Sequence, residues 1–335
     1  MPPPTSLLAA LTAQELADFL PEPLLHQVRA LAPRFEHYVT SEQTSALDFH
    51  RALAEANPEI LLACWKTPPL PAVLPPNLRY VCYLAGSVKK LVTREHIERG
   101  LLVSNWGGSI SRIVAEWALF HMLSCLRRAT FWTLAMHREG AWKNGGTETA
   151  SLFGRRVGLH GFGLVARELV RLLQPFGCVI SACAPDVTTD VESRFGVTRA
   201  TSLEALFAEN DIVVELAPLI PATTGSVTEQ HLRLLRPGGV FVNVGRGAVV
   251  DEAALLRVAR EGRIMIGLDV FTVEPLPADS PFRGLPNVTL TPHLAGPTTD
   301  RRRDAGAFAL DNLQAYIEGR PLPSGIDLRT YDSST

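Results

Sequence analysis

The stretch Arg156-Val-Gly-Leu-His-Gly-Phe-Gly-Leu-Val-Ala166 is a short apolar run that breaks into clustered glycines and then resumes with helical spacing. This order is typical of a strand, a tight turn and the start of a helix. Gly161 and Gly163 would let the backbone turn sharply and approach a pyrophosphate, which would lie at the positive end of that helix. Ala166 would let the helix pack closely on the strand. A purely structural glycine turn explains the motif equally well, so its context must decide.

The residues around this stretch favour a βαβ unit. Residues 165–173 are apolar at helical spacing, Pro175 and Gly177 end that helix, and residues 178–184 follow as a second buried strand. Helical segments are also expected over residues 202–209 and 252–261. Strands of this region are expected near Val157, Val179, Val197, Ile212, Val240, Ile266 and Val288. The alternation predicts a mainly parallel sheet with helices on both faces.

The first part of the chain shows a different pattern. Residues 1–57 are expected to be helical, because Thr12 can cap a helix with Glu15 three residues on and prolines punctuate a second helical piece. No chemistry is visible there. With 335 residues, of which 46% are hydrophobic, the chain can fill two sizeable cores, so two domains are expected.

From Glu59 onward the pattern changes to alternating strands and helices. Strands are expected over residues 60–64, 79–84 and 101–104, with a helix near residues 93–99. A long apolar helix over residues 110–126 is the expected crossing into the second domain.

Composition excludes several classes of function. The net charge of −2 provides no field that would gather nucleic acid or an anionic membrane, and the basic residues 301–303 are followed by Asp304, as on a solvated helix face. The N-terminus lacks the regions of a signal peptide, and no apolar segment is long enough to cross a bilayer. Five cysteines without metal-ligand spacing, four of them in apolar runs that look buried, indicate core thiols in a reducing compartment. A cytoplasmic protein is expected.

Three loops at the expected strand ends carry residues suited to chemistry. Arg246 lies between two glycines and could grip a carboxylate and polarise a neighbouring carbonyl. Glu274 follows the strand near Ile266, and His293 follows a proline after the last strand. Each residue alone is more often structural. Together, beside a dinucleotide turn, they suit the reduction of a 2-oxo acid, with an anion clamp, a general acid and a carboxylate that favours the protonated histidine.

At this point the sequence resembles the D-isomer-specific 2-hydroxyacid dehydrogenases, the family of glyoxylate, hydroxypyruvate and phosphoglycerate dehydrogenases. The resemblance covers about residues 59–325 and depends on four segments in order: residues 161–166, 237–247, 268–277 and 292–296. It implies an α/β fold of two Rossmann-like domains with doubly wound parallel sheets, the cofactor domain being inserted into the substrate domain. Residues 1–108 and 298–335 would form the substrate domain, and residues 109–297 the NAD(P)-binding domain.

The resemblance also implies roles for single residues. Arg246 would bind the substrate's carboxylate and carbonyl, His293 would donate the proton to the carbonyl oxygen, and Glu274 would orient His293. The substrate carboxylate would be held by backbone N–H groups of the loop formed by Ala85, Gly86 and Ser87, with Asn105 beside it. Cofactor contacts would come from Gly161, Phe162, Gly163, Leu164, Val165, Ala184, Pro218, Val244 and Asp269, the last near the nicotinamide carboxamide. No metal is implied.

Several positions depart from the family pattern. Ala184 stands where the family has an acid that binds the ribose 2′-OH and selects NAD, and residues 183–190 contain no arginine to attract a 2′-phosphate. NAD is therefore favoured, with NADP as the alternative. Leu216 replaces a common histidine near the adenosine. Lys89 and Lys90 replace an Asp-Asn pair, either as solvent-exposed residues or as partners for a second anionic group on the substrate.

The resemblance leaves open the role of Trp142, the choice between an enzyme and a sensor, and the side group of the oxo acid. Trp142 is either a core residue or an anchor between subunits, and the homodimers usual in the family favour the anchor. A dinucleotide-sensing protein, like the related transcriptional corepressors, is the alternative to an enzyme. Formate oxidation fits poorly, because the members that perform it have glutamine where Glu274 stands. The side group of the oxo acid is not indicated by Trp65, Lys66 or the loop 68–76.

Overall fold

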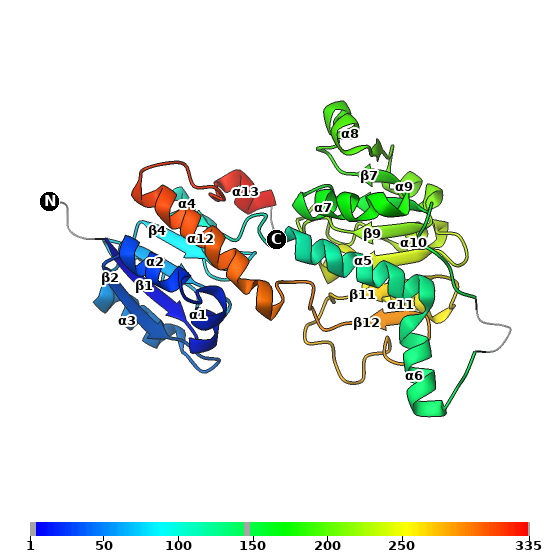
Figure 1. Ribbon diagram of the computed structural model, residues 1–335, viewed down its shortest axis with the longest axis horizontal. Helices are drawn as coiled ribbons and strands as arrows, with labels where there is room; N and C mark the ends of the chain where they lie inside the picture. Colours follow the sequence, from blue (N-terminus) through cyan, green and yellow to red (C-terminus); the bar gives the residue numbers. More distant parts are fainter. Residues whose placement is uncertain (1–4, 144–147, 334–335) are drawn as a thin grey trace. The chain divides into compact units, whose positions relative to one another are not determined.

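The computed structural model describes residues 5–143 and 148–333, which fall into two compact units (Figure 1). Unit 1 comprises Met1–Ile110 and Pro297–Thr335, and unit 2 comprises Ser111–Gly296. Each unit is an α/β layer structure with its own parallel sheet. This agrees with the α/β fold of two Rossmann-like domains expected from the sequence.

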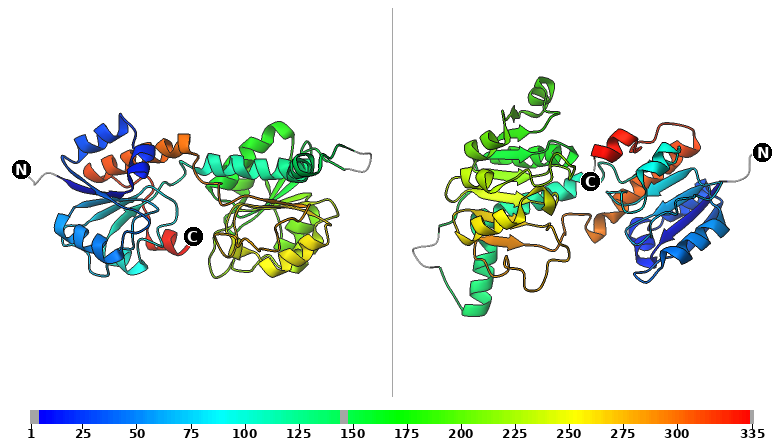
Figure 2. Two further views of the ribbon diagram at one scale, coloured as in Figure 1. Left: turned by 90° about the horizontal axis from the view of Figure 1, so that it is seen from below. Right: turned by 180° about the vertical axis from the view of Figure 1, so that it is seen from behind.

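The sheet of unit 1 has five parallel strands in the order β2-β1-β3-β4-β5. Its strands are β1 (Ser6–Leu11), β2 (Arg34–Val39), β3 (Ile60–Ala63), β4 (Tyr80–Tyr83) and β5 (Leu102–Ser104). Its helices are α1 (Ala13–Phe19), α2 (Leu24–Leu31), α3 (Ala46–Ala56), α4 (Arg94–Glu98), the short η3 (Thr299–Arg301), α12 (Arg302–Ile317) and α13 (Leu328–Ser333). Helices α2 and α12 lie on one face of the sheet and α3 on the other (Figure 2).

The expectation that residues 1–57 are helical is wrong for two segments, since β1 and β2 are strands of this sheet. Strand β1 pairs with β2 on one side and β3 on the other, and residues 7–11 are all buried. A strand buried on both faces is a continuous apolar run without alternation, so its leucines and alanines suit a helix equally well. The helix that Thr12 begins is confirmed: Thr12 and Glu15 form a capping box, with bonds of 3.0 and 2.9 Å.

The sheet of unit 2 has seven parallel strands in the order β12-β11-β10-β9-β6-β7-β8, as the strand and helix alternation predicted. Its strands are β6 (Arg156–His160), β7 (Val179–Cys183), β8 (Thr198–Arg199), β9 (Ile212–Glu215), β10 (Val240–Asn243), β11 (Met265–Leu268) and β12 (Val288–Leu290). Its helices are α5 (Ser111–Arg127), α6 (Ala129–Glu139), α7 (Leu164–Leu173), η1 (Gln174–Phe176), α8 (Thr189–Phe195), α9 (Leu203–Glu209), α10 (Glu229–Leu234), η2 (Gly247–Val249) and α11 (Glu252–Arg260).

Helices lie on both faces of this sheet (Figure 2). An apolar core fills the space between the sheet and the helices on each face. On β9, Ile212 and Val214 point toward α5 and α7, whereas Val213 points toward α9, α10 and α11. The alternation follows from the two-residue period of a strand. With both faces covered, the loops at the carboxyl ends of the strands are the part of the sheet open to a ligand.

The expectations about thiols and charges are largely confirmed. All five cysteines are free thiols; Cys64, Cys82 and Cys125 are buried, one fewer than the four expected, and Cys178 and Cys183 are half-buried. Burial raises the pKa of Cys82 to about 11.

Arg301 and Arg303 are exposed, whereas Arg302 binds Asp18 at 2.5 Å. Within residues 5–143 and 148–333, no helix is long and apolar enough to cross a membrane.

Candidate active site

The loop after β10 holds Arg246 in a defined position. The side chain of Asn243, 1% exposed, accepts the N–H of Gly245 at 3.0 Å and donates to the carbonyl of Arg246 at 3.1 Å. Gly247 packs so closely on the next loop that a Cβ atom there would lie 2.1 Å from the backbone of Phe271. Burial lowers the pKa of Arg246, and the charge of Glu274 acts in the opposite direction. Arg246 is thus a half-buried cation beside a carboxylate.

His293 and Glu274 form a pair across two neighbouring loops. Glu274 follows β11 and His293 follows β12, and Nδ1 of His293 lies 2.7 Å from Oε2 of Glu274. The backbone N–H of Phe271 donates to the other oxygen of Glu274 at 2.9 Å. Because Glu274 engages Nδ1, Nε2 is the atom through which His293 can exchange a proton with a ligand. The pair is accessible, with 46% of the histidine side chain and 35% of the glutamate exposed.

Asp269 anchors the loop that carries His293. The sequence did not indicate this structural role of Asp269. Asp269 is fully buried, its carbonyl accepts the N–H of His293 at 2.8 Å, and His293 has a left-handed backbone with φ of 55°. The carboxylate accepts four hydrogen bonds of 2.6–3.0 Å, from the side chains of Trp117 and Thr291 and the backbone N–H groups of Leu294 and Ala295. This network holds a non-glycine residue in a conformation that is seldom adopted. Contact of Asp269 with a nicotinamide stays a prediction.

The turn between β6 and α7 has the shape that a pyrophosphate requires. Gly161 has φ of 90°, and a Cβ atom there would lie 2.8 Å from the backbone of Ala217. Gly163 precedes the first turn of α7 and has open space where a side chain would be, while Ala166 is fully buried against the sheet. The free N–H groups at the start of α7 suit the phosphates of a dinucleotide.

The other expected cofactor residues lie at the same edge of the sheet. Phe162 is buried within the turn, whereas Leu164 is exposed and Val165 half-buried at the start of α7. Pro218 follows β9, and Val244 follows β10. Phe162, Pro218 and Val244 belong to loops at the carboxyl ends of strands, and Leu164 and Val165 begin the helix that follows β6. This is the edge where an open α/β sheet binds its ligand.

A cation reaches the loop after β7, where Ala184 replaces the family's acid. Arg167, on α7, has Nη2 at 4.0 Å from the carboxylate of Asp186. Its guanidinium lies over the rings of Phe162 and Phe195, at 6.0 and 5.3 Å from their centroids. This arginine lies outside residues 183–190 in the sequence, because it belongs to α7.

The expected substrate loop lies in unit 1. Ala85, Gly86 and Ser87 follow β4, and the side chain of Asn105, after β5, donates to the carbonyl of Gly86 at 2.7 Å. The structure therefore brings these four residues together in unit 1, and Arg246, Glu274 and His293 together in unit 2.

Lysines near this loop are partly engaged. Lys89 and Lys90 are exposed, and Nζ of Lys89 lies 5.6 Å from the centroid of the Tyr331 ring.

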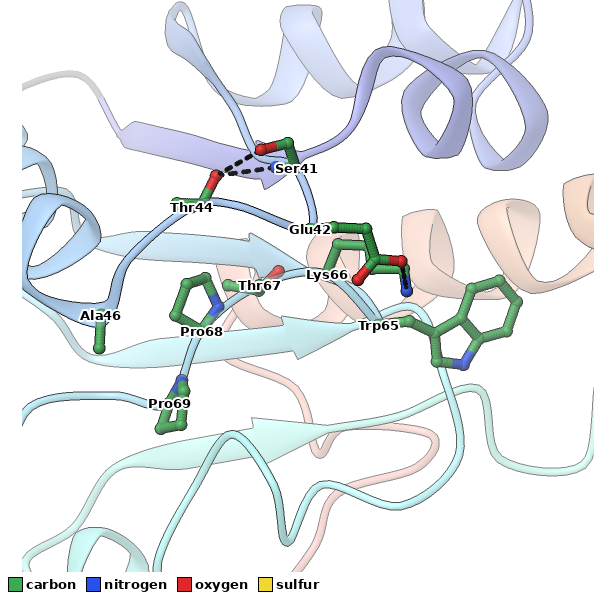
Figure 3. A pocket seen from close by; sticks show the side chains of 9 residues that line it. All are labelled: Ser41, Glu42, Thr44, Ala46, Trp65, Lys66, Thr67, Pro68 and Pro69. Carbon is green, nitrogen blue, oxygen red and sulfur yellow. Dashed lines mark hydrogen bonds and ion pairs between the residues drawn. The ribbon is translucent and has the colours of Figure 1, made fainter. Parts of the chain in front are cut away.

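A hollow of about 300 Å³ lies beyond β2 and β3, and there Lys66 is paired with Glu42 (Figure 3).

A second histidine–glutamate pair was not anticipated from the sequence. His160 and Glu215 are opposite each other at the ends of β6 and β9, with Nδ1 and Oε2 2.5 Å apart. Only 11% of the histidine side chain and none of the glutamate is exposed, and Glu215 also accepts the N–H of Ala217 at 2.7 Å. A polar residue at the end of a buried apolar run, in β6 and in β9, was the available signal. Within the described residues, no cluster of three or more potential metal ligands occurs.

Comparisons with known proteins show what the chain is similar to. Residues 119–295 match the model of the D-isomer specific 2-hydroxyacid dehydrogenase, NAD binding domain. The chain is 32% identical over 254 residues to a glyoxylate reductase of Korarchaeum cryptofilum, covering 74% of this chain and 76% of that protein. It is also 32% identical over 249 residues to a hydroxyphenylpyruvate reductase of Plectranthus scutellarioides, covering 74% and 78%.

Solved structures show the same fold. An NADPH-dependent glyoxylate/hydroxypyruvate reductase from Sinorhizobium meliloti is 26% identical, with a TM-score of 0.75 over 97% of this chain and 98% of that one. A glyoxylate reductase from Paecilomyes thermophila has a TM-score of 0.82 at 22% identity, covering 97% and 98%. At that identity the second likeness concerns the fold alone.

Proposed function

The chain belongs to the D-isomer-specific 2-hydroxyacid dehydrogenase family, and on that premise we propose that it reduces a small 2-oxo acid to the D-2-hydroxy acid, with His293 as the proton donor. As a family member it is an oxidoreductase that uses NAD or NADP. The observation that supports the proposal is the accessible His293–Glu274 pair with the cation Arg246 beside it. One histidine with an engaged Nδ1 and an available Nε2 suits a general acid.

Each residue has a distinct task in this proposal. The guanidinium of Arg246 binds the substrate's carboxylate and the developing oxyanion, for which a half-buried, constantly charged group is suited. The N–H groups of the loop from Ala85 to Ser87 hold the carboxylate. His293 transfers a proton from Nε2 to the carbonyl oxygen, and Glu274 balances the charge that His293 carries before that transfer. The bound dinucleotide supplies the hydride.

The proposal is tested by monitoring NADH and NADPH oxidation in parallel with glyoxylate, hydroxypyruvate, pyruvate, oxaloacetate and 2-oxoglutarate. We expect turnover with at least one acid. The product should be the D-2-hydroxy acid for every acid except glyoxylate, whose product glycolate has no stereocentre. If the dinucleotide binds, as followed by its fluorescence, and no 2-oxo acid of this series or with a larger side group is reduced, the proposal is wrong.

We further propose a homodimer built around α6 and the segment after it. Trp142 is 72% exposed and Phe153 67%, and α6 exposes Leu134 and Met136. Exposed tryptophans and methionines are typical of interface centres. Light scattering of the wild type and of Trp142→Asp tests this: we expect a dimer that the substitution weakens, and a monomeric wild type would contradict it.

The free thiols support a cytoplasmic location.

A further inference from the structure

Trp106 forms an apolar surface directly against the loop that we propose holds the substrate carboxylate. A Cβ atom at Gly86 would lie 2.8 Å from Cζ2 of Trp106, so the indole packs on the backbone of the loop. The backbone N–H of Trp106 donates to the carbonyl of Ala85 at 3.2 Å, which joins the two segments. A molecule held by the N–H groups of this loop therefore lies next to the indole of Trp106.

Trp65 extends this surface from the neighbouring strand. It follows β3, and its ring meets Trp106 edge-on, with centroids 6.3 Å apart and planes at 80°. Phe19 packs on it at 5.3 Å, and the guanidinium of Arg302 lies 5.4 Å from its ring. Although these contacts fix its position, Trp65 leaves 43% of its surface exposed. We call Trp65 and Trp106 the indole wall.

The position of the indole wall, next to the loop of Ala85, Gly86 and Ser87, indicates a ligand site. A single exposed apolar residue on a protein surface is ordinary. Here two indoles in contact lie at the carboxyl edge of a doubly wound sheet, next to a loop suited to an anion. Ligand sites combine apolar and aromatic walls with a few polar groups that fix orientation, and the loop and wall supply these two parts.

Cations near the indole wall already have partners. Lys66 is paired with Glu42, and Figure 3 shows the Trp65 indole projecting away from Thr44 and Pro69 at the far side of that hollow. Arg302 binds the carboxylate of Asp18 at 2.5 Å. A second anionic group on a substrate would compete with these carboxylates, whereas an uncharged ring would not disturb them.

We propose that the indole wall selects 2-oxo acids with an aromatic side group. This inference rests on the proposed function, because it uses the same carboxylate loop and the same reaction. The carboxylate lies on the N–H groups of the loop, and the ring packs on the indoles of Trp65 and Trp106. The reaction stays balanced as before: the carbonyl carbon gains a hydride, its oxygen gains a proton, and the nicotinamide is oxidised.

The test compares phenylpyruvate with glyoxylate and oxaloacetate, which share the 2-oxo carboxylate and differ in the side group. We expect kcat/KM for phenylpyruvate to exceed that for glyoxylate by about tenfold to hundredfold. Trp65→Ala should bring the ratio down by about tenfold, and Trp65→Phe, which retains a ring, should preserve most of it. Leu47→Ala, at a 68% exposed apolar position on α3, is the matched control and should leave the ratio unchanged.

The outcomes separate this inference from the proposed function. Turnover of glyoxylate without a preference for phenylpyruvate, or a preference for oxaloacetate, would overturn the aromatic class and leave the dehydrogenase reaction intact. An equal loss of kcat/KM for both substrates in Trp65→Ala would also overturn it, because a side chain that contacts the aromatic ring must affect phenylpyruvate more than glyoxylate. Absence of turnover with every 2-oxo acid, while the dinucleotide binds, would overturn the proposed function and this inference together.

Discussion

Two of the histidine–glutamate pairs in the described part of unit 2 join through Nδ1, with nearly the same geometry and opposite surroundings. In both, Nδ1 of the histidine meets a carboxylate oxygen, at 2.7 Å for His293–Glu274 and 2.5 Å for His160–Glu215. The first pair is 46% and 35% exposed on loops, and the second is 11% and 0% exposed on strands. A histidine–carboxylate contact is therefore not by itself a catalytic feature. Access of Nε2 to a ligand and a neighbouring cation distinguish the proposed site.

The backbone differs as well. His293 has a left-handed conformation held by the buried carboxylate of Asp269, whereas His160 is an ordinary strand residue bonded in register with β7 and β9. Strain at a residue is kept only where the surroundings enforce it, and such residues concentrate at functional sites. We therefore expect substitutions in the first pair to change turnover and substitutions in the second to change stability.

The largest effect is expected for His293→Ala. Loss of the general acid should lower kcat by a factor of about 10²–10⁴, while the affinity for the dinucleotide persists. Steady-state rates and dinucleotide fluorescence titration measure the two quantities. His26→Ala, at an exposed position on α2, serves as the control. Wild-type turnover in His293→Ala would remove the distinction between the two pairs.

The buried pair should respond through stability. His160→Leu leaves the carboxylate of Glu215 buried without its histidine, which should lower the free energy of unfolding by about 3–5 kcal/mol. Replacing both residues by leucine removes the stranded charge, so the double variant should recover most of the loss. Chemical denaturation measures both. A double variant no more stable than the single one would show that the pair itself stabilises the fold.

A third histidine sharpens the comparison, because it is buried without a carboxylate bonded to it. Burial lowers the pKa of His121 to about 4, partly offset by the charge of Asp269. Between pH 6.5 and about 4 the unfolded chain binds a proton that the folded chain does not, so stability is lost as the pH falls through this window. The loss should reach about 3 kcal/mol.

Denaturation at pH 7 and pH 4.5 measures this loss in the wild type and in His121→Gln. The substitution removes the titrating group, so the difference between the two pH values should shrink by about 3 kcal/mol or less. His26→Gln, at an exposed position on α2, should retain the full difference. An unchanged difference in His121→Gln would assign the pH dependence to other groups.

The smallest effect is expected for Glu274→Gln. The amide oxygen can still accept from Nδ1 of His293, so the geometry persists and only the charge is lost. We expect kcat to fall by about tenfold, less than for His293→Ala, because the general acid itself remains. Glu261→Gln, whose carboxylate pairs with Arg233 on the surface, is the matched control. A loss as large as that of His293→Ala would mean that Glu274 acts as more than a charge partner.

The sequence predicted the parts of the fold that follow from local patterns. The parallel sheet of unit 2 was correct because strands and helices alternate there with clear apolar periods. The sequence also placed Glu274 and His293 on loops after successive strands. In the structure their side chains are hydrogen-bonded. Strand β1 was missed because burial on both faces removes the alternation that identifies a strand.

Contacts that depend on packing could not be predicted in the same way. The His160–Glu215 pair requires knowing that β6 and β9 are neighbours, although they are far apart in the chain. The network around Asp269 reaches Trp117 on α5, and Arg167 approaches Asp186 from another element. The indole wall likewise joins residues after β3 and β5. Such pairings depend on strand order and helix placement, which local periodicity does not specify.

The central claim is most directly tested by following an isotope. The protein is incubated with a 2-oxo acid and with NADH or NADPH carrying deuterium at the transferable position of the nicotinamide, and the product is analysed by mass spectrometry and chiral chromatography. We predict a D-2-hydroxy acid with deuterium at C2. A bound dinucleotide that keeps its deuterium, with no hydroxy acid formed from glyoxylate or phenylpyruvate, would contradict the account and indicate a protein that senses the dinucleotide without turnover.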